Sequence, residues 1–143
     1  MPTLNNEMMR AIIIDHYSNP QNKHDPVNEG YEKVHMHSDN CIDDIDVFVK
    51  FENGVVKDAC FNGVGCAIST ASTDILCNLL VGKNVEEVKE LIEQFMHMMH
   101  EEKYDEDMLD EANAFANTSK QAARIRCATI GYRALEEILK EGK

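Results

Sequence analysis

The sequence predicts an α+β fold, in which a small antiparallel β-sheet of about three strands packs against several α-helices. Apolar and polar residues alternate in "DIDVFVKF", residues 44–51, which is the period of a half-buried strand. From Cys66 onward the apolar residues recur at the spacing of one helix face, at Ile68, Ala71, Ile75 and Leu79. Strands followed by helices, rather than alternating with them, are typical of this class.

The first half of the chain is expected to supply one helix and the sheet. "LNNEMMRAIIIDHY" has helical periodicity over about residues 4–17, and the "SNPQN" after it favours a turn. Two further strands are expected beside residues 44–51, namely 32–37 and 55–62. "ENG" joins the last two strands as a hairpin turn, because Gly54 tolerates a positive φ.

The second half is expected to be helical. A helix begins after Cys66 and ends at "GKN", a second covers about residues 85–100, and a last one covers about 128–140. The chain shows no internal repeat, low-complexity tract or linker. We therefore expect one domain over residues 1–143.

Charge and composition exclude several classes of function. A net charge of −12 argues against nucleic-acid binding, which needs Lys and Arg to neutralise phosphates. No apolar run approaches the roughly 20 residues of a membrane span, and the N-terminus lacks the features of a signal peptide, so a cytoplasmic location is expected. The acidic residues 101–112 predict a solvated face or loop, with a docking surface for a basic partner as the alternative.

Three of the five cysteines have the sequence context of metal ligands. Cys66 and Cys127 each stand before a helical run, and the positive end of a helix favours a thiolate. Cys41 and Asp43 are two residues apart, so an extended backbone points both to one side. Three sulfurs and one oxygen suit four-coordinate zinc. The spacings of 25 and 61 match no standard zinc finger, and a buried structural thiol remains an alternative for each cysteine.

The remaining cysteines and histidines have simpler interpretations. Cys77 lies too far along its helix to share a metal with Cys66, and we expect it and Cys60 to be core residues. The pairs His35/His37 and His97/His100 have ligand spacing but are expected to lie on exposed faces. The context of His16 leaves open whether it is structural or faces the site.

Together, these motifs resemble the U-type iron–sulfur cluster assembly family, and within it the SufU branch. The resemblance covers nearly the whole chain and rests on "IIIDHYSNPQNK", "GVGCAISTAS" and "ARIRCATIGYRALEEIL". It implies a helix, a small antiparallel sheet and packed helices. It also implies a site of Cys41, Asp43, Cys66 and Cys127, with Arg124 matching a family arginine three residues before the last cysteine.

The branch is indicated by two features. Scaffold-type IscU proteins have a histidine directly before the third cysteine, where this chain has Arg126, and a Leu-Pro-Pro-Val-Lys motif that it lacks. SufU-type proteins carry an insertion between the second and third cysteines, and 60 residues separate them here. The resemblance therefore implies a zinc-bound protein that accepts sulfur from a cysteine desulfurase, a PLP enzyme, and serves downstream iron–sulfur assembly proteins.

The resemblance also suggests roles for individual residues. We expect Cys41 to accept the sulfur, Cys66 and Cys127 to hold the metal, and Arg124 to steady the thiolate or the transferred sulfur. Ile42 replaces the family glycine, so that the loop could be stiffer or Asp44 could replace Asp43 as the ligand. Two alternatives remain: a scaffold that assembles a [2Fe–2S] cluster on the same cysteines, and a structural zinc module that recruits partners.

Overall fold

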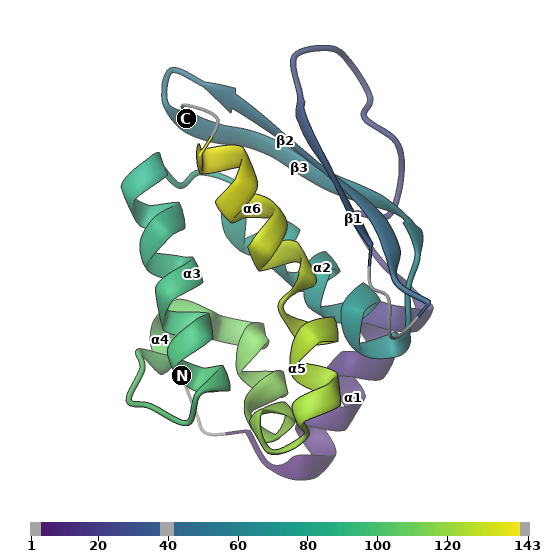
Figure 1. Cartoon of the computed structure of the whole chain (residues 1–143), viewed down its shortest axis with the longest axis vertical. Helices are drawn as coiled ribbons and strands as arrows, with labels where there is room; N and C mark the ends of the chain where they lie inside the picture. The colour runs from purple at the N-terminus through teal and green to yellow at the C-terminus, as the bar shows by residue number, and fades with distance from the viewer. Residues whose placement is uncertain (1–3, 38–41, 141–143) are drawn as a thin grey trace.

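A computed structural model describes residues 4–37 and 42–140, and it has the α+β architecture that the sequence predicts. Three antiparallel strands form one sheet in the order β1 (Glu32–His37), β2 (Asp44–Glu52) and β3 (Val55–Val64). The helices gather beside this sheet (Figure 1). Ile45, Val47 and Val49 of β2 are buried as their alternation predicts, and the side chains between them face outward.

The β2–β3 hairpin closes where the sequence places it. Asn53 and Gly54 have φ values of 56° and 77°, so both central residues of the turn are left-handed. This geometry matches the twist of the paired strands, and Gly54 adopts it without a steric cost.

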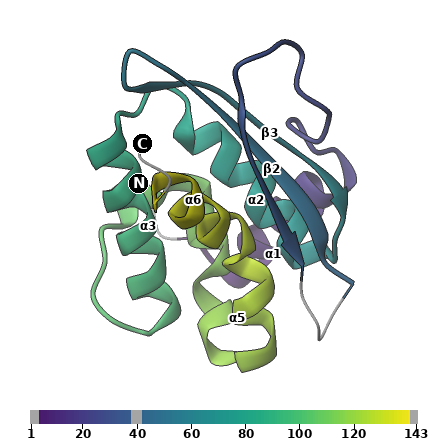
Figure 2. The ribbon, with the colours of Figure 1, turned by 45° about the horizontal axis from the view of Figure 1, so that its top comes forward.

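The helices are α1 (Asn6–Ser18), α2 (Ala67–Leu80), α3 (Val85–Met99), the short α4 (Glu106–Leu109), a 3₁₀ helix η1 (Asp110–Lys120), α5 (Ala122–Ala128) and α6 (Ile130–Lys140). Helix α2 is central, since it contacts β3, α1, η1, α5 and α6 (Figures 1 and 2). Its buried face joins the sheet to the remaining helices through Ala71, Ile75 and Leu76. Cys66 is the N-cap residue directly before α2, so the packing of this helix also fixes the position of the Cys66 thiol.

Residues 101–112 are not simply a loop. Helices α4 and η1 begin within this acidic stretch, and its acidic side chains are mostly exposed, as expected of a solvated face. Leu109, Ala112, Phe115 and Thr118 are buried, and so are Asn113 and Ala114 between them. A 3₁₀ helix has 3.0 residues per turn, so the first four lie on one face of it. The acidic composition, which favours a solvated face or loop, hides these buried positions.

The last predicted helix, about residues 128–140, corresponds to α6, and the sequence did not predict α5 before it. Helix α5 ends at Ala128 and α6 begins at Ile130, with Thr129 between them. The hydroxyl of Thr129 donates to the carbonyl of Ile125 at 2.8 Å, and this contact caps the end of α5. Cys127 therefore lies in the last turn of α5, three residues before the start of α6.

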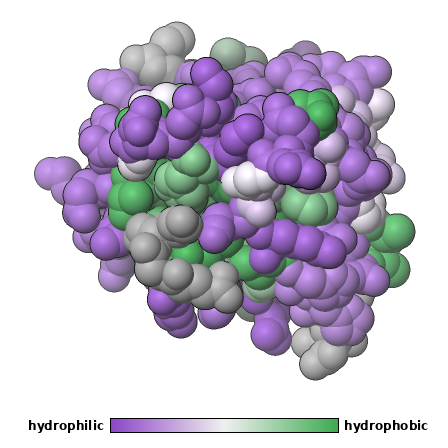
Figure 3. Space-filling view, turned by 90° about the horizontal axis from the view of Figure 1, so that it is seen from above, coloured by the Kyte–Doolittle hydropathy of each residue, from purple (hydrophilic) through white to green (hydrophobic). Residues whose placement is uncertain are grey.

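Hydrophilic side chains dominate the face shown in Figure 3, with smaller hydrophobic patches between them. This agrees with the 28% of charged residues in the sequence. Among the described residues, no helix is both long enough and apolar enough to cross a membrane.

Candidate metal centre

Asp43, Cys66 and Cys127 come together at one end of the sheet. One ligand atom from each lies within 4.8 Å of the other two. Asp43 directly precedes β2, Cys66 precedes α2, and Cys127 lies in α5, so three separate elements supply the group. No other group of three or more His, Cys, Asp or Glu side chains meets this criterion in residues 4–37 and 42–140. Cys41, the fourth expected ligand, lies outside the described residues.

The carboxylate of Asp43 is held in place by the start of α2. Its Oδ1 accepts hydrogen bonds from the backbone N–H of Cys66 at 3.0 Å and from the hydroxyl of Ser69 at 2.7 Å. Asp43 is 1% exposed. Asp44, the alternative ligand, instead lies on the sheet surface and contacts Nε2 of His35 at 2.8 Å. The structure therefore brings Asp43, and not Asp44, to the two thiols.

Cys66 is the N-cap of α2, in agreement with its predicted position just before a helical run. Its sulfur accepts a hydrogen bond from the backbone N–H of Ser69 at 3.4 Å. Ser69 thus contacts both Cys66 and Asp43, although the sequence analysis did not select it. The available signal was its position, because the third residue of a helix supplies a free N–H to the N-cap side chain.

Two glycines make the tight path into Cys66 possible. Gly63 has a φ of 123°, and a Cβ atom there would collide with the carbonyl oxygen of Asp44 on the neighbouring strand. At Gly65 a Cβ atom would lie 2.5 Å from the hydroxyl oxygen of Ser69. Side chains at these positions would push β3 away from β2 and displace the residue that holds Asp43, so "GVGC" allows the close approach of the ligands.

Cys127 lies in the last turn of α5, a helix that the sequence did not predict, and the predicted helix follows it as α6 from Ile130. Cys66, by contrast, directly caps the positive end of α2. Cys127 is buried, and Ser72 of α2 fixes the adjacent turn by donating a hydrogen bond to the carbonyl of Ala128 at 2.6 Å. This bond couples the helix that begins at Cys66 to the helix that carries Cys127.

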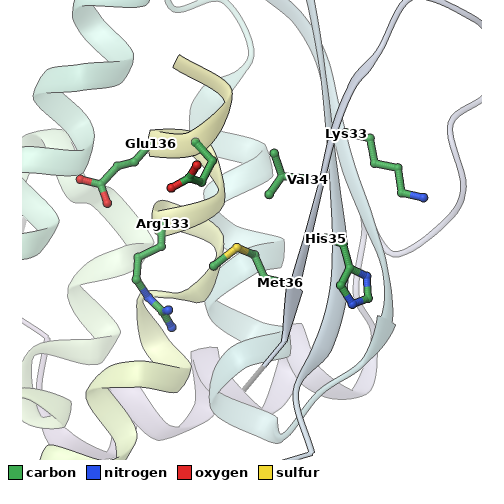
Figure 4. Close-up of a pocket in the computed structure, with 7 residues that line it drawn as sticks. Lys33, Val34, His35, Met36, Arg133 and Glu136 are labelled. Carbon is green, nitrogen blue, oxygen red and sulfur yellow. The ribbon is translucent and has the colours of Figure 1, made fainter. Parts of the chain in front are cut away.

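Arg133 of α6 also forms hydrogen bonds to the turn beside Cys127. Its guanidinium donates to the backbone carbonyl of Arg126 at 2.8 Å and to the hydroxyl of Thr129 at 3.3 Å. Burial, and secondly the nearby charge of Arg126, lower the pKa of Arg133. It lines a cavity of about 590 Å³ between β1 and α6, into which Val34 and Met36 point while Lys33 and His35 point away (Figure 4).

The donor set fits zinc. Zinc binds thiolates at about 2.3 Å and carboxylates at about 2.0–2.2 Å, so tetrahedral ligands lie roughly 3.5–3.8 Å apart. Atoms within 4.8 Å of one another need only small side-chain rotations to reach that arrangement. Two soft sulfurs and one oxygen match zinc, and the same thiolates also suit iron.

The other residues selected from the sequence occupy varied positions. Arg124 is exposed on α5, one turn before Cys127. Ile42 is 63% exposed. Cys60 and Cys77 are buried, and burial raises the pKa of Cys60 to about 11 and that of Cys77 well above its usual range. Both are therefore core thiols in their protonated form.

Among the described residues, no histidine joins the group of Asp43, Cys66 and Cys127, although His37 is paired in register with Asp44. Nδ1 of His35 contacts Oδ1 of Asp46 at 2.8 Å, while His37 and His100 are exposed and His97 is partly so. His16 has the structural role that its sequence context left open. It is 2% exposed, with Nδ1 2.6 Å from Asp74 and Nε2 3.1 Å from Glu111. It therefore links α1 to α2 and η1, contacts that no local sequence pattern indicates.

Comparison with known proteins identifies the family. The family model described as the NifU-like N-terminal domain matches residues 8–128, most of the chain. The chain belongs to this family. It is 37% identical over 131 residues to the Bacillus subtilis protein named zinc-dependent sulfurtransferase SufU. The matched region covers 91% of this chain and 88% of that protein. It is also 34% identical over 136 residues to the protein of Streptococcus pyogenes named iron–sulfur cluster assembly scaffold protein IscU, covering 94% and 84% of the two chains.

Solved structures agree with this assignment. The crystal structure named a putative iron–sulfur cluster assembly scaffold protein for the SUF system, from Fervidobacterium islandicum, superposes with a TM-score of 0.79 at 25% identity and covers 87% of this chain and 91% of that one. This member of the U-type iron–sulfur cluster assembly family therefore has the fold of its relatives. The resemblance found in its motifs is confirmed.

Proposed function

We propose that this protein is a zinc-bound sulfur acceptor in iron–sulfur cluster assembly, which takes persulfide sulfur from a cysteine desulfurase. The observation that carries the proposal is the group of Asp43, Cys66 and Cys127 within 4.8 Å, in a chain of the U-type family. The sulfurtransferase name of the Bacillus relative supports the choice of reaction. A reducing compartment such as the cytosol would keep these thiols free of disulfides.

Cys66, Cys127 and Asp43 would hold the zinc, with Cys41 as the fourth ligand. When bound, zinc keeps its cysteine ligands as thiolates at neutral pH and limits their oxidation. The protein's own contribution is to fix the ligands. Ser69 and the backbone N–H of Cys66 orient Asp43, and Arg133 and Ser72 fix the turn beside Cys127.

The sulfur transfer needs a nucleophilic thiolate, for which we propose Cys41. Its sulfur attacks the outer sulfur of the donor's persulfide and forms a new S–S bond. The donor's S–S bond breaks, and its electron pair leaves on the donor cysteine as a thiolate. No net oxidation occurs, because one persulfide replaces another. Arg124, exposed one turn before Cys127, would stabilise the negative charge on the transferred sulfur.

The experiment is single-turnover transfer of radiolabelled sulfur from a SufS-type desulfurase to the wild type, Cys41→Ser and Cys77→Ser. We expect label on the wild type and on Cys77→Ser, whose altered thiol lies in the core, and none on Cys41→Ser. Full labelling of Cys41→Ser would overturn the role of Cys41. Absence of label on the wild type would overturn the sulfur-acceptor function.

A scaffold function is the second candidate, favoured by the name of the Streptococcus relative. The same thiolates would then bind an iron–sulfur cluster. A structural zinc module is the third candidate, and it predicts that Cys41→Ser unfolds the protein. The circular dichroism spectrum and thermal midpoint of Cys41→Ser separate that outcome from a specific loss of transfer.

A further inference from the structure

The turn that contains Cys127 is held by side chains from two other helices. Arg133 extends along α6 toward the start of that helix (Figure 4), and its Nη2 donates to the backbone carbonyl of Arg126 at 2.8 Å. Ser72 of α2 donates to the carbonyl of Ala128 at 2.6 Å. Both residues that flank Cys127 in the chain are therefore fixed through their carbonyls, so tertiary contacts, and not α5 alone, set the position of this thiol.

A second contact in the same turn orients the guanidinium of Arg133. Its Nε donates to the hydroxyl of Thr129 at 3.3 Å, and that hydroxyl donates in turn to the carbonyl of Ile125 at 2.8 Å. A planar guanidinium that donates to two neighbouring groups is held in one orientation, which the single ammonium of a lysine would not be. The positive charge of Arg133 therefore has a fixed place beside this turn.

The charges of two candidate zinc ligands act on Arg133. Burial has the largest effect on its pKa and lowers it, and the negative charges of Asp43 and Cys127 are among the effects that oppose this. Arg133 is half-buried, whereas Arg124 and Arg126 are exposed on α5. Because water and salt screen an exposed charge more strongly than a partly buried one, Arg133 is the best placed of these three arginines to interact with the ligands.

The zinc-loaded form of the centre needs such a positive charge. Two thiolates and one carboxylate bring three negative charges, and a zinc ion brings two positive charges, so the three described ligands leave one negative charge. A thiolate of Cys41 would increase it to two. Asp43 and Cys127 are only 1% and 5% exposed, so water compensates this charge poorly.

We propose that Arg133 is a positioning residue of the zinc centre, which holds Cys127 in place through the turn and offsets the negative charge of the ligands. This role rests on the proposed function, because it concerns the zinc-loaded form. The family resemblance indicated Arg124 instead, which is exposed one turn before Cys127. Arg124 remains available to the transferred sulfur, whereas Arg133 acts on the ligands themselves.

The zinc affinities of three variants test this role. Arg133→Met keeps an apolar stem and removes the charge and both donors, whereas Arg133→Lys restores the charge. Lys140→Met is the matched control, because it removes the same charge from an exposed residue about two turns further along α6. Zinc would be titrated against a chromophoric chelator, and binding of Co²⁺ would be followed through its thiolate charge-transfer band.

We expect Arg133→Met to bind zinc about tenfold more weakly or worse, with a weaker Co²⁺ band. Arg133→Lys and Lys140→Met should stay within about threefold of the wild type. A merely structural role would lower the urea midpoint of the metal-free protein without recovery of zinc affinity in Arg133→Lys. Should circular dichroism show that Arg133→Met does not fold, Arg133→Gln takes its place with the same expected loss.

Wild-type zinc affinity in Arg133→Met, or a loss that Arg133→Lys does not relieve, would overturn the role of Arg133. Sulfur transfer to the wild type would still support the proposed function in that case. Conversely, a wild type that binds zinc but takes no sulfur from a SufS-type desulfurase would contradict the proposed function, while the comparison of zinc affinities would still decide the role of Arg133.

Discussion

Replacing Asp43 separates its role in folding from its role as a ligand. Its carboxylate accepts the N–H of Cys66 and the hydroxyl of Ser69 in a site where Asp43 is 1% exposed. In Asp43→Ala the Ser69 hydroxyl has a second acceptor, the carbonyl of Cys66 at 3.2 Å. The N–H of Cys66 is only partly buried and has none, so its loss costs less than the about 1–3 kcal/mol of a fully buried unsatisfied donor. We therefore expect the free energy of unfolding of metal-free Asp43→Ala to fall by about 1–2 kcal/mol.

Asp43→Asn distinguishes the two roles further. The amide oxygen of asparagine still accepts the hydrogen bonds, so the metal-free protein should lose less than about 1 kcal/mol. A neutral amide is a poor zinc ligand, so zinc affinity should fall by about tenfold or more. Urea denaturation after chelation and zinc titration against a chromophoric chelator measure the two quantities.

Asp44→Asn is the matched control, because Asp44 is exposed and lies on the sheet surface beside His35. It should change the free energy of unfolding by less than about 0.5 kcal/mol and leave zinc affinity unaltered. If Asp44→Asn weakened zinc binding as much as Asp43→Asn, or if Asp43→Ala changed neither quantity, the assignment of Asp43 would be refuted.

Three further predictions concern the elements around the centre. Gly63→Ala, at a φ of 123° and against the backbone of β2, should lower the free energy of unfolding in urea by about 2 kcal/mol or more, whereas Gly82→Ala, with a φ of 91° in open space, should cost about 1 kcal/mol. Burial lowers the pKa of His16, but hydrogen bonds to Asp74 and Glu111 outweigh it and raise the pKa above 6.5. Protonated His16 therefore stabilises the folded state fully below pH 6.5, and this stabilisation is lost as the pH rises through the pKa of His16 in the folded protein. The difference in urea midpoint between wild type and His16→Gln should accordingly shrink between about pH 6 and about pH 8. Ala122→Pro, at the first residue of α5 after Gln121 with non-helical φ and ψ of −124° and 87°, should raise the melting temperature by a few degrees, about 0.4–1 kcal/mol, and a lower melting temperature would contradict that reading of the helix start.

The sheet and the first three long helices could be predicted because hydrophobic period alone determines them. Residues 44–51 alternate, with Phe48 as the one apolar residue on the polar side, and α2 follows the helical spacing from Ile68 onward. The segment from Glu106 to Lys120 was not predicted to be helical because its acidic composition favours a solvated face or loop. The break at Thr129 depends on a hydrogen bond between its own side chain and a carbonyl in the preceding turn, which hydrophobic patterns do not reveal.

The candidate centre was only partly predictable. The local context of Cys66 indicated an N-cap thiol, and the glycines before it indicated a tight approach. Asp43, Cys66 and Cys127 are far apart in the sequence; the contexts of the cysteines suggested a shared zinc site, and the family resemblance strengthened that prediction. The contacts of Arg133 and His16 arise from tertiary packing, for which sequence spacing carries no signal. Ser69 could have been found from its position three residues after the N-cap Cys66.

Metal and sulfide content tests the central claim most directly. The wild type and Cys66→Ser would be purified without oxygen and analysed for zinc, iron and acid-labile sulfide. The account predicts about one zinc per wild-type chain without labile sulfide, and little zinc in Cys66→Ser. Iron with matching sulfide in the wild type would identify a cluster scaffold instead, and a wild-type chain that holds neither metal would contradict the metal centre itself.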